Sequence, residues 1–435
     1  MKNTIKLLSL LAAGAMISAG FAQAQDKALL DALVNKGVLT QQEAEQIAKE
    51  TVVVKPAQST TRSIAINGMV QAQYRWIQND VKTNPIALGT GKQRAVNDFT
   101  LRRLYLGATA DLGNGWSGVI NADFAATTTG AGGRNYIDKA FIRKAVDWDF
   151  LQGNLDVGYR KVNFGQEENT GAASLLAIER SIATNYFTGG PIGNLNDVNV
   201  GARYVGIFWD GTVPQVDGLS YSLAITNTQN QTFQVNNAVS NSIATWVGVA
   251  YTNNFDELGY SGGLNFGYLP KANVGAGLER SIYVFNPYVE LTYDAALLRA
   301  EYLMGRVENG QAPQALPGTG SQSATPMGIN ATVAYTFDLD QMGAIQPVFR
   351  YSWLQTNGRG VQPSDVIPGA NAVGTNPNFN YANAFYFGAN WYLMGESVKV
   401  SAGYEYTQFN QTAVAPGVGN RANTNAIRAQ LQLLF

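Results

Sequence analysis

Apolar and polar residues alternate along most of the chain. In the segment 425–435, Ile427 and Leu431 fall on one parity, whereas Arg428 and Gln432 fall on the other. A period of two with one apolar and one polar face is typical of a strand between two different environments. Strands of about 9–11 residues, tilted by about 45°, can cross a bilayer core. The pattern therefore predicts membrane-crossing strands, although a soluble β-sandwich can use the same alternation.

Sixteen segments show this alternation, and the connections between them are long and short in turn. Short connections such as 111–115 carry turn residues, and long ones such as 77–97 and 357–380 are polar. We expect a 16-stranded antiparallel up-and-down transmembrane β-barrel with short periplasmic turns and long external loops. Sixteen strands leave an aqueous channel. The expected strands are 62–76, 98–111, 115–125, 135–147, 152–163, 198–210, 217–227, 244–254, 259–269, 281–293, 296–308, 325–338, 343–357, 380–394, 396–410 and 422–435.

The polar parity of these strands carries amides, hydroxyls and charges of both signs, which indicates water rather than a packed core. The parity of 135–147 is ambiguous. All seven tryptophans lie near a predicted strand end, which is typical of a girdle at the headgroup level. A soluble sandwich would more often bury some of them in mid-strand. They are Trp76, Trp116, Trp148, Trp209, Trp246, Trp353 and Trp391.

The first 24 residues resemble a secretory signal peptide. Lys2 and Lys6 form a basic region, 7–17 is apolar, and 22–24 reads Ala-Gln-Ala, a cleavage site. We expect the mature chain to start at Gln25. No other segment approaches 18 consecutive apolar residues, so we expect an exported protein that reaches the membrane only as a closed barrel.

The segment 25–50 differs from the rest because its apolar residues follow helical spacing. Gly37 can end a first helix, and the capping box 40–43 opens a second one. We expect a helical periplasmic or oligomerisation segment here, with a partly ordered spacer as the alternative. Residues 51–61 read as a linker, and 62–435 as the barrel domain.

Composition excludes many enzymes. The chain has no cysteine and no histidine, so thiolate nucleophiles, Ser-His-Asp triads and zinc held by either residue are excluded. No cofactor is expected. Without Lys2 and Lys6, 28 bases face 31 acids, a net charge of −3. This balance does not indicate a nucleic-acid partner.

Residues 158–190 contain two linked motifs. The first has the pattern G-x-x-K-x-x-F-G-x-E and ends at Glu167, and the second reads I-E-R-S-x-A-T-N over 178–185. Together they resemble the phosphate-selective porin O/P family. A weaker match covers 390–393 and 398–400. The resemblance implies a trimeric outer-membrane porin whose third external loop, about 164–197, folds into the barrel and narrows the pore.

Charged residues on the loop and the polar parity are the candidates for selectivity. Arg180 is the only base between 164 and 197, against Glu167, Glu168, Glu179 and Asp197. A phosphate site needs converging bases, so this loop argues against tight phosphate binding. Each wall arginine could instead be one half of an ion pair. The residues expected to line the pore are Arg75, Arg160, Lys161, Glu167, Glu179, Arg180, Arg299, Arg350, Lys399 and Arg428.

We therefore expect an outer-membrane porin for passive diffusion of small hydrophilic solutes, with a mild preference for anions. Alternatives are a specific phosphate or anion channel, a structural or adhesive barrel that binds partners through its loops, and, least supported, an enzyme. Expected partners are outer-membrane lipid, two further copies in a homotrimer, and the barrel assembly machinery. Phe435, the last aromatic of the apolar parity, is the expected assembly signal.

Overall fold

The fold is described from a computed structural model of the chain. The expected segments 1–24, 25–50 and 51–61 lie outside the described residues. No helix in the described part of the chain is long and apolar enough to cross a membrane. The described residues are 62–83, 91–125, 136–189, 197–228, 242–273, 279–308, 323–373, 379–410 and 421–435.

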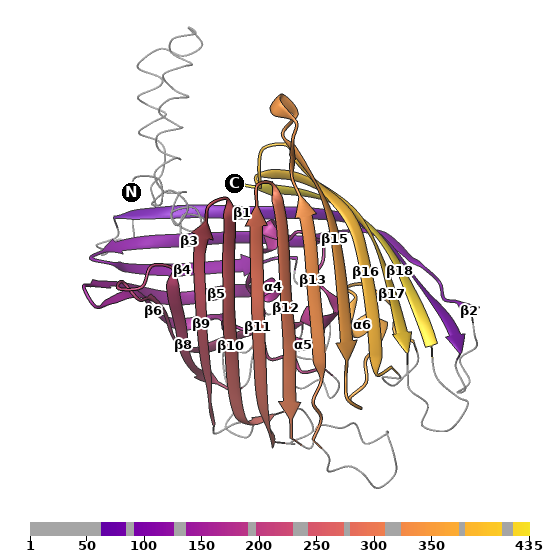
Figure 1. Ribbon diagram of the computed structural model, residues 1–435, viewed down its shortest axis with the longest axis horizontal. Coiled ribbons are helices and arrows are strands. Elements are labelled where there is room, and N and C mark those ends of the chain that lie inside the picture. The colour runs from indigo at the N-terminus through magenta and orange to yellow at the C-terminus, as the bar shows by residue number, and fades with distance from the viewer. Residues whose placement is uncertain are drawn as a thin grey trace.

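Sixteen long strands form one closed antiparallel barrel (Figure 1). The short strands β2 (Gly91–Lys92) and β14 (Phe337–Asp338) pair with β1 and β15 and only extend the wall. The expectation of sixteen strands is confirmed. The long strands are β1 (Ser63–Thr83), β3 (Val96–Gly113), β4 (Trp116–Asp123), β5 (Ile137–Trp148), β6 (Leu151–Lys161), β7 (Arg203–Thr212), β8 (Leu219–Asn227), β9 (Ile243–Phe255), β10 (Leu258–Asn273), β11 (Glu279–Tyr293), β12 (Ala296–Val307), β13 (Met327–Tyr335), β15 (Ala344–Gln355), β16 (Tyr381–Tyr392), β17 (Val398–Asn410) and β18 (Arg421–Leu434).

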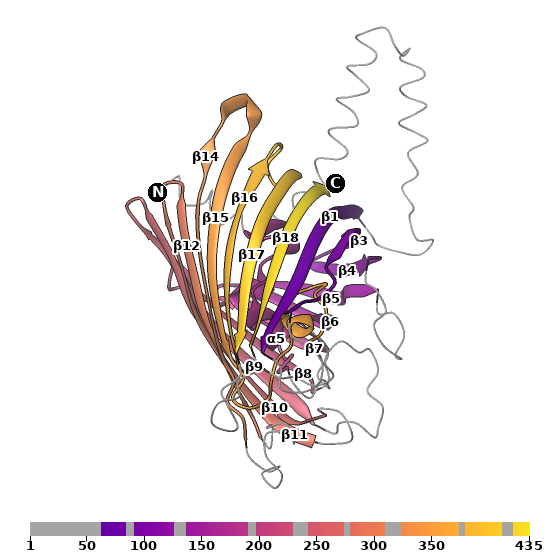
Figure 2. The ribbon, with the colours of Figure 1, turned by 90° about the vertical axis from the view of Figure 1, so that its right-hand side faces the viewer.

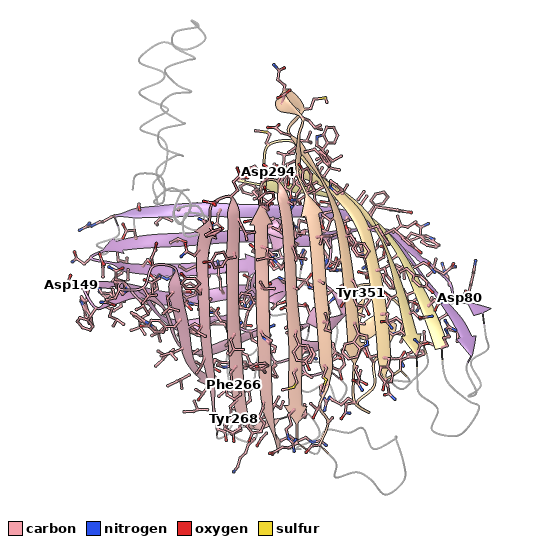
Figure 3. All side chains as sticks on the ribbon, viewed as in Figure 1. Asp80, Asp149, Phe266, Tyr268, Asp294 and Tyr351 are labelled. Atoms are coloured by element: carbon pink, nitrogen blue, oxygen red, sulfur yellow. The ribbon has the colours of Figure 1, made fainter. Side chains whose placement is uncertain are left out.

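Each strand presents its two faces to different surroundings. On β1, Gln71 is fully buried inside the barrel, whereas Ile66 is 67% exposed on the outside. Figure 3 shows Asp294, in the short turn between β11 and β12, at the opposite end of the barrel from Tyr268 of β10. Because short turns of such barrels face the periplasm, the end that carries Asp294 is the periplasmic one.

The wall closes between β1 and β18 through a glycine and an aromatic ring. The backbone N–H of Gly68 donates to the carbonyl of Phe435 (2.7 Å), and the N–H of Phe435 donates back to Gly68 (3.1 Å). A Cβ atom at Gly68 would lie 2.3 Å from Cζ of the Phe435 ring. The ring therefore lies against the backbone of β1 at the seam.

Replacing Gly68 by valine is expected to displace the Phe435 ring and to lower the yield of folded barrel, because overpacking typically costs about 1–3 kcal/mol. Phe435→Lys should lower it further. The measurement is the fraction of membrane protein that shows heat-modifiable mobility. Gly118→Val is the matched control, since a Cβ atom there meets nothing within 4 Å. Equal yields for the Gly68 and Gly118 variants would contradict this account of the seam.

Two expectations from the sequence are wrong in detail. Trp246 does not belong to an interfacial girdle, because its side chain is 2% exposed and faces the lumen. The expected strand start at residue 198 is also wrong, because β7 begins at Arg203. Residues 198–202 instead pack under the loop, where the N–H of Val198 donates to the carbonyl of Tyr186.

Candidate functional site: the lumen and its two inward loops

The described part of the connection between β6 and β7, residues 162–189 and 197–202, folds into the barrel. It contains α4 (Gln166–Asn169), the short helix η1 (Ala172–Ser174) and α5 (Ile182–Thr188). Figure 2 shows α5 inside the wall. Aromatic rings cluster where the loop begins. The ring centroid of Trp246 lies 5.3 Å from that of Tyr204 and 6.5 Å from that of Phe164. Burial of these rings holds both ends of the loop against β7 and β9.

Glu301 of β12 fixes the first turn of this loop. Its carboxylate accepts hydrogen bonds from the backbone N–H groups of Gln166 (2.7 Å) and Glu167 (3.2 Å). It also accepts from the hydroxyl of Thr184 in α5 (3.2 Å). A single wall carboxylate thus connects α4 and α5, and it is 4% exposed. Sequence reasoning did not identify Glu301 as a loop anchor.

Arg350 of β15 holds the middle of the same loop. Its guanidinium donates to the Glu167 carboxylate (2.8 Å), to the backbone carbonyl of Glu179 (2.7 Å) and to the Glu405 carboxylate of β17 (2.7 Å). Arg350 is 2% exposed. Buried charges require such pairing, because an unpaired one is costly. Arg350 therefore lies between loop and wall and not at the water-filled surface.

Arg102 of β3 completes the attachment. Its Nε and Nη2 atoms donate to the two carboxylate oxygens of Glu179, at 2.6 and 2.8 Å. Arg102 is the extra residue of a β-bulge, because Gln71 of β1 pairs with Arg103 and Ala72 pairs with Leu101. Such a bulge lets two consecutive residues face one side of a sheet. Arg102 and Arg103 therefore both face the lumen.

A second bulge lies on β5. Asn121 of β4 pairs with Lys139 and Ala122 pairs with Ile137, which leaves Asp138 as the extra residue. Asp138 and Lys139 both line the lumen. The bulge breaks the alternation at Asp138, and further along β5 the apolar Phe141 lines the lumen while Lys144 has the opposite parity, so the segment has no clear parity in the sequence.

The loop carboxyls have lowered pKa values. Burial alone would raise the pKa of Glu167 and Glu179. At Glu167 the charge of Arg350 and hydrogen bonds from Thr184 and Ser181 together outweigh burial and lower the pKa. At Glu179, Arg102 does the same together with Arg103 and Arg428. The ionised forms therefore stabilise the loop above about pH 4.3, the usual glutamate value. That contribution is lost only as the pH falls through the lowered pKa values.

Single-channel conductance is accordingly expected to stay constant between pH 7 and about pH 5, and to change only below about pH 4. Recordings across a pH series at constant salt measure this. A transition centred near pH 6 would show that the two carboxyls do not hold the loop in the way the geometry indicates.

A second loop, between β15 and β16, also folds inward. Its helix α6 (Pro363–Val366) packs against α5, and the Asn185 side chain donates to the carbonyl of Val366 (2.9 Å). Figure 2 shows α5 and α6 close together within the wall. Arg428 of β18 donates to the carbonyl of Pro368 (3.0 Å). This loop therefore covers the part of the wall that carries Arg428.

One lumen cavity, here called the basic pocket, measures about 500 Å³ and lies between strands β3–β7 and the loop. Eight of its lining residues are bases and three are acids. In the described ranges no group of acidic side chains is placed to hold a metal ion. The charged residues that line the pocket are Arg102, Arg103, Asp123, Asp138, Lys139, Arg143, Arg160, Lys161, Glu168, Arg180 and Arg203.

Six of the eight bases form ion pairs with carboxylates. Arg102 pairs with Glu179, Arg143 and Arg160 share Asp156, Lys161 and Arg180 share Glu168, and Arg203 pairs with Asp138. Among the described residues, neither Arg103 nor Lys139 forms an ion pair; Arg103 donates to the side-chain oxygen of Gln71 (2.7 Å). The six paired bases share five carboxylates, and Asp123 also lines the pocket, so bases exceed carboxylates by two. Arg103 is 3% exposed, whereas Lys139 is half-buried and lies two strands away on β5. Sequence reasoning missed both of them.

A second cavity, here called the neutral pocket, measures about 900 Å³ and is bounded by β6–β12 and the loop. Its charged residues are paired: Glu290 with Arg299 (2.6 Å) and Asp210 with Arg160 (2.6 Å). Most of its other polar lining groups are amides and hydroxyls. The two pockets share Asn169, Thr170 and Gly171 of the loop, so this loop segment lies between them.

The expected site residues occupy several different settings. Arg160, Lys161 and Arg180 line the basic pocket and Arg299 lines the neutral one. Glu167 and Glu179 are buried in the loop attachment. Arg75 pairs with Asp98 (2.6 Å), and Lys399 is 2% exposed and donates to the carbonyl of Ala173. Arg350 and Arg428 are also buried against the two loops.

A closed sixteen-strand barrel with an apolar outside, a polar lumen and an inward loop defines an outer-membrane porin, a channel for small solutes. The family described as "Phosphate-selective porin O and P" matches residues 70–435, and the chain belongs to this family. It is therefore an outer-membrane β-barrel protein, and its family and fold are those of a channel rather than an enzyme. No curated protein sequence matches it.

Solved structures share the fold at low sequence identity. An anion-selective porin from Comamonas acidovorans has a TM-score of 0.55 and 14% identity, covering 86% of this chain and 99% of that one. The outer membrane channel DcaP of Acinetobacter baumannii has a TM-score of 0.51 and 12% identity, covering 85% and 97%. At these identities the similarity concerns the fold alone.

Proposed function

We propose that this porin is a general diffusion channel with a weak preference for anions, which arises in the basic pocket. The observation that carries the proposal is the excess of two bases over carboxylates around the basic pocket, where Lys139 is half-buried and has no ion-pair partner among the described residues. Six of the pocket's bases share five carboxylates, so most of their charge is balanced. At physiological salt the screening length is about 8 Å, so two charges bias the passage of ions without dominating it.

A specific phosphate channel is the second candidate, and one observation favours it. The bulges and the loop path gather eight bases around one cavity, although the loop itself supplies only Arg180. Tight phosphate binding needs several bases that are free to converge on one anion, and six of these bases are already paired. The weak preference therefore fits the pocket better.

We also propose that the functional unit is a homotrimer. In each copy, we propose, a cleaved signal peptide (1–24), a helical segment (25–50) and a linker (51–61) precede the barrel domain (62–435). The helical segment serves assembly or anchoring in the periplasm. Cross-linking of the purified protein, with and without 25–50, tests both points. A trimer whose yield is unaffected by the deletion would remove the assembly role of that segment.

Replacing Lys139 by glutamine is expected to move the chloride-to-potassium permeability ratio toward one, because it removes one of the two excess positive charges from a side chain that lines the pocket. Reversal potentials in a salt gradient measure the ratio. Arg75→Gln is the charge-matched control: it removes the same charge from an arginine paired with Asp98 outside the basic pocket, and it should have the smaller effect. Submillimolar phosphate blocking most of the chloride current would favour the phosphate channel instead.

A further inference from the structure

The two pockets follow one another along the pore axis. Arg160 and Lys161, at the outer end of β6, line the basic pocket, whereas Asn154, near the periplasmic end of the same strand, lines the neutral pocket. On β7, Arg203 at the outer end lines the basic pocket, and Thr212 at the periplasmic end lines the neutral pocket. A solute that enters from outside therefore meets the bases first and the neutral chamber second.

The neutral pocket has the chemistry of a site for hydroxyl groups. Its charges are paired, and the side chains of Asn154, Asn265 and Ser222 are among its uncharged polar groups. Amide and hydroxyl side chains can each donate to or accept from a solute hydroxyl.

An aromatic surface lies on the same wall. Tyr288 of β11 lies against Gly263 of β10: a Cβ atom there would be 2.4 Å from both Cζ and the hydroxyl oxygen of the tyrosine. The glycine therefore lets the ring lie close to the strand while the residue still lines the pocket. Aromatic rings offer an apolar surface beside a polar group, which suits the C–H faces of a hydroxylated ring.

We propose that the preferred solutes are small organic anions with a hydroxyl-bearing body, such as sugar acids. The acid group lies near Lys139 among the bases of the basic pocket, and the hydroxylated body occupies the neutral pocket beside Tyr288. A single solute can contact both pockets because both include Asn169–Gly171 of the loop. This inference rests on the proposed anion preference, and it adds the class of solute.

The test compares three probes of similar ring size for their ability to reduce the chloride current through single channels: galacturonate, cyclohexanecarboxylate and galactose. Galacturonate should have a half-blocking concentration about five- to tenfold lower than either of the others, because only it combines a charge with hydroxyls. Cyclohexanecarboxylate as effective as galacturonate would overturn the inference. If wild-type reversal potentials show no anion preference, the proposed function itself fails, which is a separate result.

Two variants separate the contributions of the pockets. Tyr288→Phe, which removes only the hydroxyl, should weaken block by galacturonate and galactose but not by cyclohexanecarboxylate. Lys139→Gln should weaken block by both acids but not by galactose. Heat-modifiable mobility establishes that each variant is folded. Equal effects of each variant on all three probes would contradict the division of roles.

Discussion

Replacing Arg350 by methionine is expected to detach the loop 164–197 from the wall and to raise single-channel conductance. The change leaves the Glu167 and Glu405 carboxylates buried without their shared guanidinium, and breaking a buried pair in this way costs about 3–5 kcal/mol. The temperature at which the heat-modifiable form unfolds in detergent should fall accordingly. Conductance in planar bilayers reports the release of the loop.

Arg299→Met is the matched control for stability. Arg299 is also a wall arginine paired with a glutamate, but the side chains of Arg299 and Glu290 are 17% and 26% exposed. Partly exposed pairs contribute about 1 kcal/mol or less, so this variant should leave the unfolding temperature nearly unchanged. Equal losses for the two variants would mean that burial of the Arg350 network does not determine its importance.

Deleting Leu101 is expected to prevent efficient assembly of the barrel, whereas deleting its neighbour Arg102 is not. Either deletion removes the bulge on β3 and restores strict alternation. Without Leu101, however, Arg102 takes its outward position, where Leu101 is 51% exposed. An arginine on the lipid face costs about 2–4 kcal/mol at the midplane of the bilayer and less toward the interfaces.

The yield of folded protein in the membrane fraction measures the difference between these deletions. Both lose the Arg102–Glu179 pair, so loss of that pair cannot account for a difference in yield. Arg102→Ala, which keeps the bulge, should assemble well and lose only the attachment of Glu179. Comparable yields from both deletions would contradict the bulge as the device that turns Arg102 inward.

The barrel could be predicted from the sequence because its physical cause is local. Alternation every second residue reports the two environments of a strand, so Gln71 and Ile66 could be assigned to opposite faces. Assignment of strand faces from alternation fails where a bulge interrupts the period of two. Arg102 and Arg103 are adjacent, so strict alternation would have to point one of them at lipid. Two adjacent arginines inside an apolar–polar strand are therefore a signal for a bulge.

The functional site was less accessible to sequence reasoning because it is made by distant contacts. The motif that ends at Glu167 located the inward loop, but not the wall residues that hold it. Arg350 and Lys399 have the inward parity of pore-lining bases, and alternation cannot distinguish a side chain in water from one covered by a loop. Trp246 illustrates the same limit, because a position near a strand end is shared by girdle residues and by rings buried beneath a loop.

Reversal potentials in planar bilayers under a salt gradient test the central claim most directly. The wild-type protein should insert in discrete conductance steps and show a permeability ratio near one that modestly favours chloride over potassium. Millimolar phosphate should barely reduce the chloride current, because Arg103 and Lys139 alone lack carboxylate partners among the described bases of the basic pocket. A sealed barrel, a preference for potassium, or block by submillimolar phosphate would contradict the account.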